Sequence, residues 1–220
     1  MGADLTDFIS SDQYKKDFAE AAEQQSLPIL HDVKTHSDTI ISFVESFEST
    51  TIFLDQVTAV HQYNTANIVL QIGKKLDLST FKLVEAVLGA RVHDVGKILV
   101  PKEIIQKPAC LSDDEYGIIK THCVMGHLMV SKFETPFCLE KYPLCHHERI
   151  DGSGYPSGDK GKEVSLMLRI LHVADVFEAT TATRHYRKPV TAINAIDYLY
   201  SELGQFDVKV IDALASFTRL

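Results

Sequence analysis

Two pairs of neighbouring side chains have the residue types that bind divalent metal ions. His93 is followed directly by Asp94, and His146 is followed directly by His147. Adjacent residues of a helix point roughly 100° apart, so one member of a pair can bind one ion while its neighbour reaches a second. A carboxylate has two oxygens and can bridge both ions. The pairs therefore indicate a dinuclear metal centre.

Three further side chains of the same kinds lie in other segments of the chain, and they complete a ligand set of five histidines and two carboxylates: His61, His122 and Asp175. Nitrogen and oxygen ligands without thiolate favour iron, manganese, nickel or zinc, among which the sequence does not choose. A single helical histidine such as His61 means little alone. The prediction rests on the set, which suits two octahedral ions with positions left for water or substrate.

A glycine-rich turn follows the second pair, in the stretch HHERIDGSGYPSG that begins at His146. The glycines let the chain double back beside the metals, while Tyr155 presents an aromatic face or hydroxyl and Pro156 stiffens the exit. Glu148, Arg149 and Asp151 are candidates for orienting the ligand histidines. For Arg149 and Asp151 a structural ion pair is an equally good explanation.

Helices must position these residues, because apolar residues recur at helical spacing and almost no stretch shows the alternation of a strand. Ser79 is a candidate N-cap for a helix that loses its pattern near Gly96, and Ser112 to Glu115 has the form of a capping box. Helices are predicted over residues 51–76 with His61, after Ser112 with His122, 163–180 with His172 and Asp175, 192–203 and 208–220. The fold class is therefore all-α.

The first 50 residues are also predicted to be helical, with Pro28 as a break, but they carry no sign of chemistry. We expect residues 1–50 to form an N-terminal helical extension and residues 51–220 to form the catalytic domain. The extension is a dimerisation or sensor-coupling element, or the remnant of a longer regulatory region. The sequence does not decide among these.

Composition excludes several classes of protein. The 220-residue chain has a net charge of -8, which argues against binding of duplex nucleic acid through its phosphates. Its apolar runs are too short to span a membrane and its N-terminus lacks a signal peptide, so a cytoplasmic protein is expected. The four cysteines form no CxxC pair and are predicted to be free thiols. Only Cys145 is expected beside the site, as a small buried hydrophobe.

Several motifs in succession resemble those of the HD-GYP family, a branch of the HD phosphohydrolase superfamily. They are HDVGK from His93 to Lys97, IIKTHCVMGH around His122, the HHERIDGSGYPSG stretch, and LRILHVADVFEATTATRHYR from Leu168 to Arg187. The resemblance covers residues 51–220, in order and with short spacers. It implies an HD-domain helical bundle with a bi- or trinuclear metal centre in its core.

The resemblance also implies an activity, the hydrolysis of cyclic dinucleotides, chiefly cyclic di-GMP, in bacterial signalling. Asp94 and Lys97 would be catalytic, with Lys97 beside the substrate phosphate and Tyr155 and Glu178 as further substrate contacts. Arg184 and Arg187 would contact phosphates or guanine edges, as guanidinium groups can. The implied metal ligands are those found above: His61, His93, Asp94, His122, His146, His147 and Asp175.

The chemistry of such a site suggests a mechanism. Two divalent ions per chain, iron or manganese before nickel or zinc, lower the pKa of a water and hold the phosphodiester for in-line attack. Lys97 offsets charge that builds on the phosphoryl oxygens. The product would be linear pGpG, with a second cleavage to GMP as a further step.

Departures from the family pattern refine these expectations. Val57 stands where some members carry a glutamate that helps hold a third metal, so a dinuclear site is favoured. Glu178 replaces the commoner aspartate, which would alter the guanine pocket. The histidines left out of the site are His31, His36 and His127, as structural or solvent-facing residues, together with His172 and His185.

Two alternatives to a cyclic di-GMP phosphodiesterase stay open. One is hydrolysis of another substrate, cyclic GMP-AMP or, less consistent with the intact GYP turn, a mononucleotide. The other is a catalytically poor module that binds cyclic di-GMP and passes the signal to a partner. As a separate expectation, the N-terminal helices would form a homodimer or bind a regulatory partner.

Overall fold

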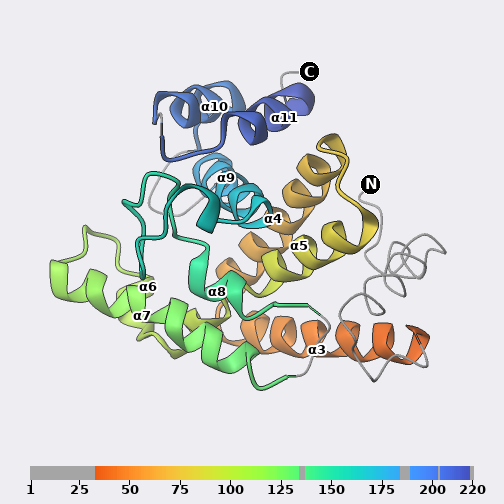
Figure 1. Cartoon of the computed structure of the whole chain (residues 1–220). Coiled ribbons are helices and arrows are strands. Elements are labelled where there is room, and N and C mark those ends of the chain that lie inside the picture. Colours follow the sequence, from red (N-terminus) through yellow and green to blue (C-terminus); the bar gives the residue numbers. More distant parts are fainter. Residues whose placement is uncertain (1–32, 134–136, 184–188, 203, 219–220) are drawn as a thin grey trace.

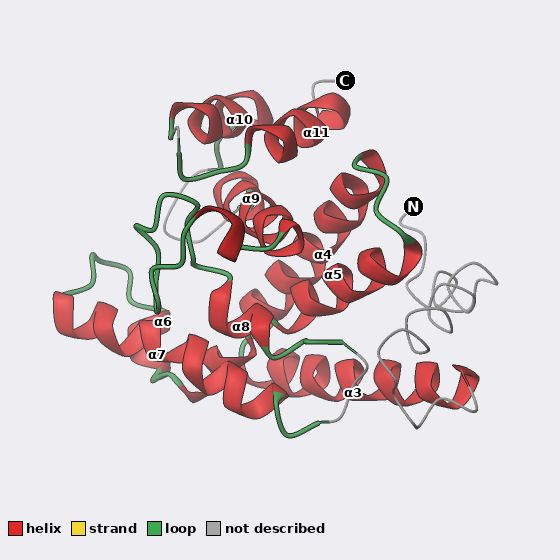
Figure 2. Cartoon of the chain, viewed as in Figure 1, coloured by secondary structure: helices red, strands yellow, loops and turns green. Residues whose placement is uncertain are grey.

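Helices make up the regular structure of the described residues, as the helical spacing of apolar residues predicts (Figure 2). The computed structural model describes residues 33–133, 137–183, 189–202 and 204–218, and these ranges contain no strand. The α-helices are α3 (Val33–Leu54), α4 (Gln56–Lys75), α5 (Thr80–Val92), α6 (Lys102–Ile105), α7 (Asp113–Val130), α8 (Lys141–Cys145), α9 (Leu166–Thr181), α10 (Ala192–Ser201) and α11 (Val208–Thr218). Two 3₁₀ turns, η1 (Val95–Leu99) and η2 (Gly161–Glu163), lie between them.

The centre of the bundle is formed by α4, which packs along both α5 and α9 (Figure 1). Helices α10 and α11 pack together and against α9. Apolar side chains from all of these helices are fully buried, among them Ile72, Leu88, Ile170, Ile196 and Leu214. Burial of this apolar surface supplies the main driving force for folding.

A close approach of two backbones joins α7 to the turn that carries Asp94. A Cβ atom added to Gly96 would lie 2.0 Å from the carbonyl oxygen of His122 and 2.6 Å from the amide nitrogen of Gly126. Only glycine fits such a contact. The glycine therefore brings the segment after α5 against the middle of α7, where His122 lies.

Helix caps agree with the sequence in part. The capping box is confirmed, since Ser112 Oγ accepts from the amide of Glu115 (3.2 Å) and the Glu115 carboxylate accepts from the amide of Ser112 (2.8 Å). Ser79 does precede α5, but its side chain makes no capping hydrogen bond. Ser165 caps α9, which begins at Leu166 and not at residue 163.

The boundary between the first two described helices differs from the expected one. Residues 51–54 belong to α3, and α4 begins only at Gln56 because the Asp55 side chain accepts from the amide of Val57 and caps it. Helix α3 contributes Phe43 and Val44 to the common core, and the Phe43 ring lies 4.5 Å from that of Phe133. The division at residue 50 falls inside α3 and stays a prediction.

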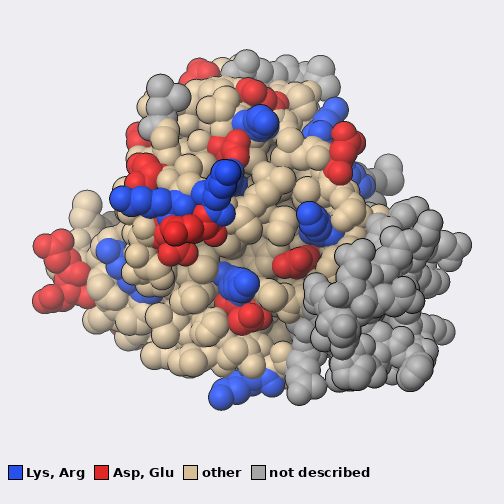
Figure 3. Space-filling view, in the orientation of Figure 1, with Lys and Arg blue, Asp and Glu red and all other residues tan. Residues whose placement is uncertain are grey.

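The surface is polar and mixed in charge. Acidic and basic side chains are interspersed over the face shown in Figure 3. Among the described residues, no helix has the length and apolar character needed to cross a membrane.

Candidate metal centre

Five helices or helix ends converge on one buried cluster of histidine and aspartate side chains. The cluster contains all seven residues selected from the sequence: His61 on α4, His93 and Asp94 directly after α5, His122 on α7, His146 and His147 directly after α8, and Asp175 on α9. His93, His122 and His146 have no exposed surface, and Asp94 is 1% exposed. Residues far apart in the sequence are thus brought into direct contact.

Hydrogen bonds to the backbone fix the tautomers of three of these histidines. Each directs Nδ1 at a carbonyl oxygen three residues earlier: His93 at Ala90 (2.7 Å), His122 at Ile119 (2.6 Å) and His146 at Pro143 (2.8 Å). A carbonyl only accepts hydrogen bonds, so Nδ1 carries the proton and Nε2 of the neutral ring carries a lone pair. Histidines that bind metals are oriented in this way.

The lone pairs so fixed face one another and a carboxylate. The Nε2 atoms of His122 and His146 are 3.2 Å apart, and Asp94 Oδ1 lies 3.4 Å and 3.5 Å from them. His93 Nε2 and Asp94 Oδ1 are buried without a hydrogen-bond partner. Electron pairs in this arrangement repel one another, and a cation among them would remove this repulsion. The donor set therefore fits metal ions.

The side chains fall into two groups that could each hold an ion. One consists of His61, His93 and Asp94, and the other of His122, Cys123, His146 and His147; within each group one ligand atom per residue lies within 4.8 Å of the others. Asp94 belongs to the first group and directs Oδ1 at the second.

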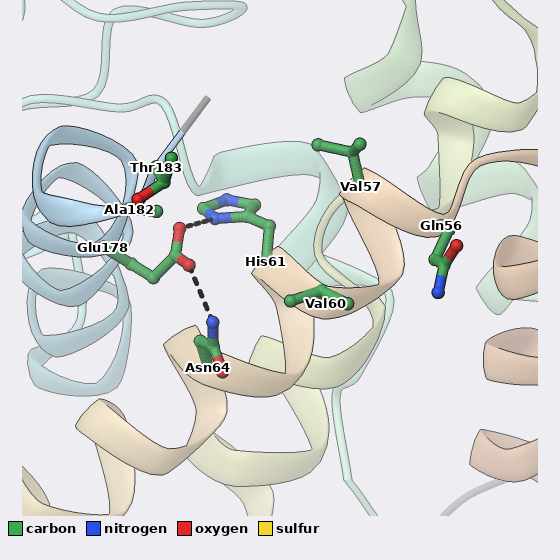
Figure 4. A pocket seen from close by; sticks show the side chains of 8 residues that line it. All are labelled: Gln56, Val57, Val60, His61, Asn64, Glu178, Ala182 and Thr183. Atoms are coloured by element: carbon green, nitrogen blue, oxygen red, sulfur yellow. Dashed lines mark hydrogen bonds and ion pairs between the residues drawn. The ribbon is translucent and has the colours of Figure 1, made fainter. Parts of the chain in front are cut away.

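Glu178 contacts one ring nitrogen of His61 (Figure 4). Asp175 contacts the other ring nitrogen. His61 Nε2 lies 2.9 Å from Asp175 Oδ1, and His61 Nδ1 bonds to Glu178 Oε2, whose other oxygen accepts from Asn64 Nδ2 (3.0 Å). Burial opposes the charged imidazole, but these hydrogen bonds outweigh it and raise the pKa of His61 to about 9. His61 and Glu178 also line a cavity of about 400 Å³ with Gln56, Val57, Val60, Asn64, Ala182 and Thr183.

The pKa values of the histidine pair after α8 are lowered, whereas that of His61 is raised. Burial lowers the pKa of His146 to about 4, and burial also holds the pKa of His147 well below its usual value. Both rings are neutral at pH 7 and have a nitrogen available for a metal ion.

Lys97 and Tyr155, expected to meet the substrate, border the cluster. Lys97 Nζ lies 2.6 Å from Asp94 Oδ2, and its side chain is 27% exposed. The Tyr155 ring stacks on that of His147 at 4.6 Å, and the Lys120 ammonium lies 4.9 Å from the Tyr155 ring. Two more expected contacts, Arg184 and Arg187, lie outside the described residues, as do His31 and His185.

The turn after the histidine pair is held by Glu148, which is almost fully buried. Its carboxylate accepts hydrogen bonds from the amides of Ser157 (2.7 Å) and Asp159 (3.0 Å), so its contacts are to this loop. Gly154 is required because a Cβ there would lie 2.4 Å from the carbonyl oxygen of His147. The chain thus doubles back directly over the histidines.

Arg149 and Asp151 make separate contacts. The Arg149 guanidinium lies 5.1 Å from the Phe206 ring, while Asp151 Oδ1 accepts from the amide of Ser153 (2.9 Å). His172 also packs against Phe206, at 4.6 Å between ring centres.

The sequence alone did not predict that Cys123 adjoins the site. All four thiols are free, as expected, but the expectation that Cys145 alone adjoins the site is wrong. Cys123 is fully buried, and its Sγ lies 3.6 Å from His122 Nε2. Burial raises the pKa of Cys123 to about 12, so the thiol is protonated in the metal-free protein. The available signal was its position directly after His122.

Comparison with known proteins places this fold and cluster in a family. The model of the HD domain family matches residues 40–210. The chain belongs to the HD domain family. The HD-type resemblance of the motifs is thereby confirmed. Among solved structures, this HD domain is similar to Bd1817, an HDG"Y"P protein from Bdellovibrio bacteriovorus, with a TM-score of 0.62 and 19% identity over 94% of this chain and 70% of that one. This likeness shows the shared all-helical fold.

Two curated relatives are named for their activities. The chain is 32% identical over 203 residues to the cyclic di-GMP phosphodiesterase response regulator RpfG of Xanthomonas campestris, covering 90% of this chain and 53% of the relative. It is 32% identical over 166 residues to the 3'3'-cGAMP-specific phosphodiesterase 1 of Vibrio cholerae, covering 72% of this chain and 37% of the relative. The HD domain thus spans about half or less of these proteins.

Proposed function

We propose that this HD domain is a metal-dependent phosphodiesterase that hydrolyses a cyclic dinucleotide, with cyclic di-GMP as the first candidate. The observation that carries the proposal is the convergence of histidine Nε2 atoms on the buried Oδ1 of Asp94, which makes no hydrogen bond. Such a site suits cations, and phosphodiester hydrolysis is a reaction that paired cations promote. The names of the relatives point to the same reaction and substrate class.

The ligands would be His61, His93, Asp94, His122, His146, His147 and Asp175, and they would hold two divalent ions, iron or manganese before nickel or zinc. Bound ions would supply Lewis acidity toward the phosphate and lower the pKa of the attacking water. Val57, four residues before His61, is 52% exposed and has no ligand atom, which supports two ions in preference to three.

The chain's own groups would orient the substrate and balance its charge. Hydrolysis forms one bond from a water oxygen to phosphorus and breaks the bond to the ester oxygen, which leaves with a proton. Lys97, beside Asp94 and partly exposed, would offset the charge on the phosphoryl oxygens. Tyr155 would offer its ring to a base, Glu178 would border the base pocket, and Arg184 and Arg187 would bind phosphates or guanine edges.

Cyclic GMP-AMP is the second candidate substrate, because a relative named for that specificity is as similar to this chain, at 32% identity, as one named for cyclic di-GMP. A homodimer or regulatory contact through the N-terminal helices is also proposed, as is a cytoplasmic location.

The test is a comparison of substrates on one preparation. The full chain, loaded with iron or manganese, is incubated separately with cyclic di-GMP, 3'3'-cyclic GMP-AMP and a cyclic mononucleotide, and the products are separated by chromatography. We expect linear dinucleotide from at least one cyclic dinucleotide, and none from the Asp94→Asn variant. Tight binding of cyclic di-GMP without cleavage by the metal-loaded protein would instead support a binding module.

A further inference from the structure

Cys123 lies in the cluster of histidines and aspartates but is not one of its seven predicted metal ligands. It is fully buried on α7, and its Sγ belongs with ligand atoms of His122, His146 and His147 to the group whose members lie within 4.8 Å of one another. Its Sγ lies 3.6 Å from His122 Nε2. That nitrogen carries a lone pair, because Nδ1 of the same ring is directed at the Ile119 carbonyl.

Close packing of two helices makes this position available. Adjacent residues of a helix point roughly 100° apart, so His122 and Cys123 can both reach the centre only if it lies between their directions. A Cβ on Gly126 would lie 2.7 Å from Pro143 Cβ, so the glycine lets α8 approach α7 closely. The His146 ring is thereby brought to 5.1 Å from the His122 ring, beside the thiol.

A second observation points to a ligand at this place. Asp94 Oδ1 is buried, lacks a hydrogen-bond partner, and lies 3.4 Å and 3.5 Å from Nε2 of His122 and His146. These three atoms present electron pairs to a common space. The one thiol proton of Cys123 can satisfy at most one of them, and only weakly, since S–H is a poor donor.

We propose that Cys123 coordinates, as a thiolate, the divalent cation held by His122, His146 and His147. On binding, the S–H bond breaks, its proton passes to solvent, and a sulfur–metal bond forms without oxidation of the sulfur. The inference rests on the metal centre of the proposed function and adds a ligand to one half of it. The two halves then differ, because His61, His93 and Asp94 offer only nitrogen and oxygen.

A thiolate ligand changes which metal ion the group of His122, Cys123, His146 and His147 prefers. Soft sulfur ligands favour zinc over manganese or magnesium, which prefer oxygen. In competition, the wild-type protein should therefore retain zinc against excess manganese better than Cys123→Ser does. Cys145→Ser is the matched control, because Cys145 is a second, partly buried thiol next to His146 that does not belong to the group.

The deciding experiment is X-ray absorption spectroscopy on the full chain loaded with one zinc equivalent. Zinc–sulfur and zinc–nitrogen distances differ, at about 2.3 Å and about 2.0 Å. We expect a sulfur contribution in the wild type and in Cys145→Ser, and its loss in Cys123→Ser. The cobalt-loaded wild type should also show thiolate-to-cobalt charge-transfer absorption in the near ultraviolet, which needs no variant.

The other outcomes overturn the assignment in distinguishable ways. If bound zinc has only nitrogen and oxygen neighbours, or if cobalt shows no charge-transfer band, Cys123 is not a metal ligand. The proposed phosphodiesterase activity is unaffected by that result. Sulfur that persists in Cys123→Ser and disappears in Cys145→Ser assigns the other thiol. If the chain binds no metal, the centre and this inference fail together.

Discussion

Among single residues, Glu178 shows how a side chain can act through another. It bonds to His61 Nδ1 and accepts from Asn64, and it thereby orients the ring whose Nε2 faces Asp175. Replacing Glu178 by Gln keeps the shape and removes the charge. Loss of such a partner typically lowers metal affinity or activity by about 10–100-fold.

Metal affinity and steady-state kinetics of Glu178→Gln distinguish this role from the predicted contact with substrate. A positioning role lowers metal affinity and kcat. A rise in KM for the dinucleotide, with metal affinity unchanged, would instead assign Glu178 to the guanine pocket.

His61 also makes the stability of the metal-free protein depend on pH. Its folded-state pKa of about 9 lies above the ordinary value of 6.5, so its charged form is favoured by folding. That stabilisation is fully present below about pH 6.5 and is lost as the pH rises through about 9. Urea unfolding in chelator should therefore show a larger fall in unfolding free energy over this range for wild type than for His61→Asn. Parallel curves for the two proteins would refute the assignment.

At the residue scale, the sequence alone predicted the seven residues of the cluster but not all of the side chains that contact them. Motif order and residue type predicted the seven members of the cluster, because those side chains come from recognisable local patterns. The contact between His61 and Glu178 depends on how α4 packs on α9, which no local pattern contains. Cys123 was overlooked because a buried thiol in a helix has an ordinary packing role.

At the level of elements, the approach of α7 to the turn after α5 depends on Gly96. An alanine Cβ there would lie 2.0 Å from the carbonyl oxygen of His122 and would force the two backbones apart. We expect Gly96→Ala to lower the unfolding free energy by about 1–3 kcal/mol and to reduce metal binding, since Asp94 and His122 would separate.

Gly117, which lies on α7, provides the matched control. A Cβ at this exposed position in α7 meets no atom within 4 Å. Alanine should stabilise the helix by about 0.5–1 kcal/mol, and metal binding should not change. Equal effects of the two substitutions on chemical denaturation would show that helix propensity, and not the backbone contact, dominates at Gly96.

The helices were predictable from the sequence where caps and apolar periodicity are local features of the chain. The capping box at Ser112, apolar periodicity and the absence of strand patterns gave the helices and their order. The start of α4 was misplaced because the apolar residues 52–54 continue the periodic pattern across Asp55, whereas the Asp55 cap separates two helices. Such a boundary depends on how the two helices are oriented in the folded protein.

On the scale of the whole molecule, α3 and the rest of the bundle share one core. Phe43 is 7% exposed and packs against Phe133, whereas Phe53 on the same helix is 85% exposed. Phe43→Ala should lower the unfolding free energy by about 3 kcal/mol, and Phe53→Ala should change it by less than about 0.5 kcal/mol. A small effect of both would favour an extension that ends near residue 50 and folds apart from the domain.

The proposed activity depends on metal ions that act with this cluster on a cyclic dinucleotide. The most direct measurement is the rate of cyclic di-GMP cleavage as iron or manganese is titrated into the chelator-stripped full chain. We predict no cleavage without metal, a rate that rises until about two ions per chain are bound, and no cleavage by Asp94→Asn at any metal concentration. Undiminished cleavage by the stripped protein, or cleavage by Asp94→Asn equal to the wild type, would contradict the account.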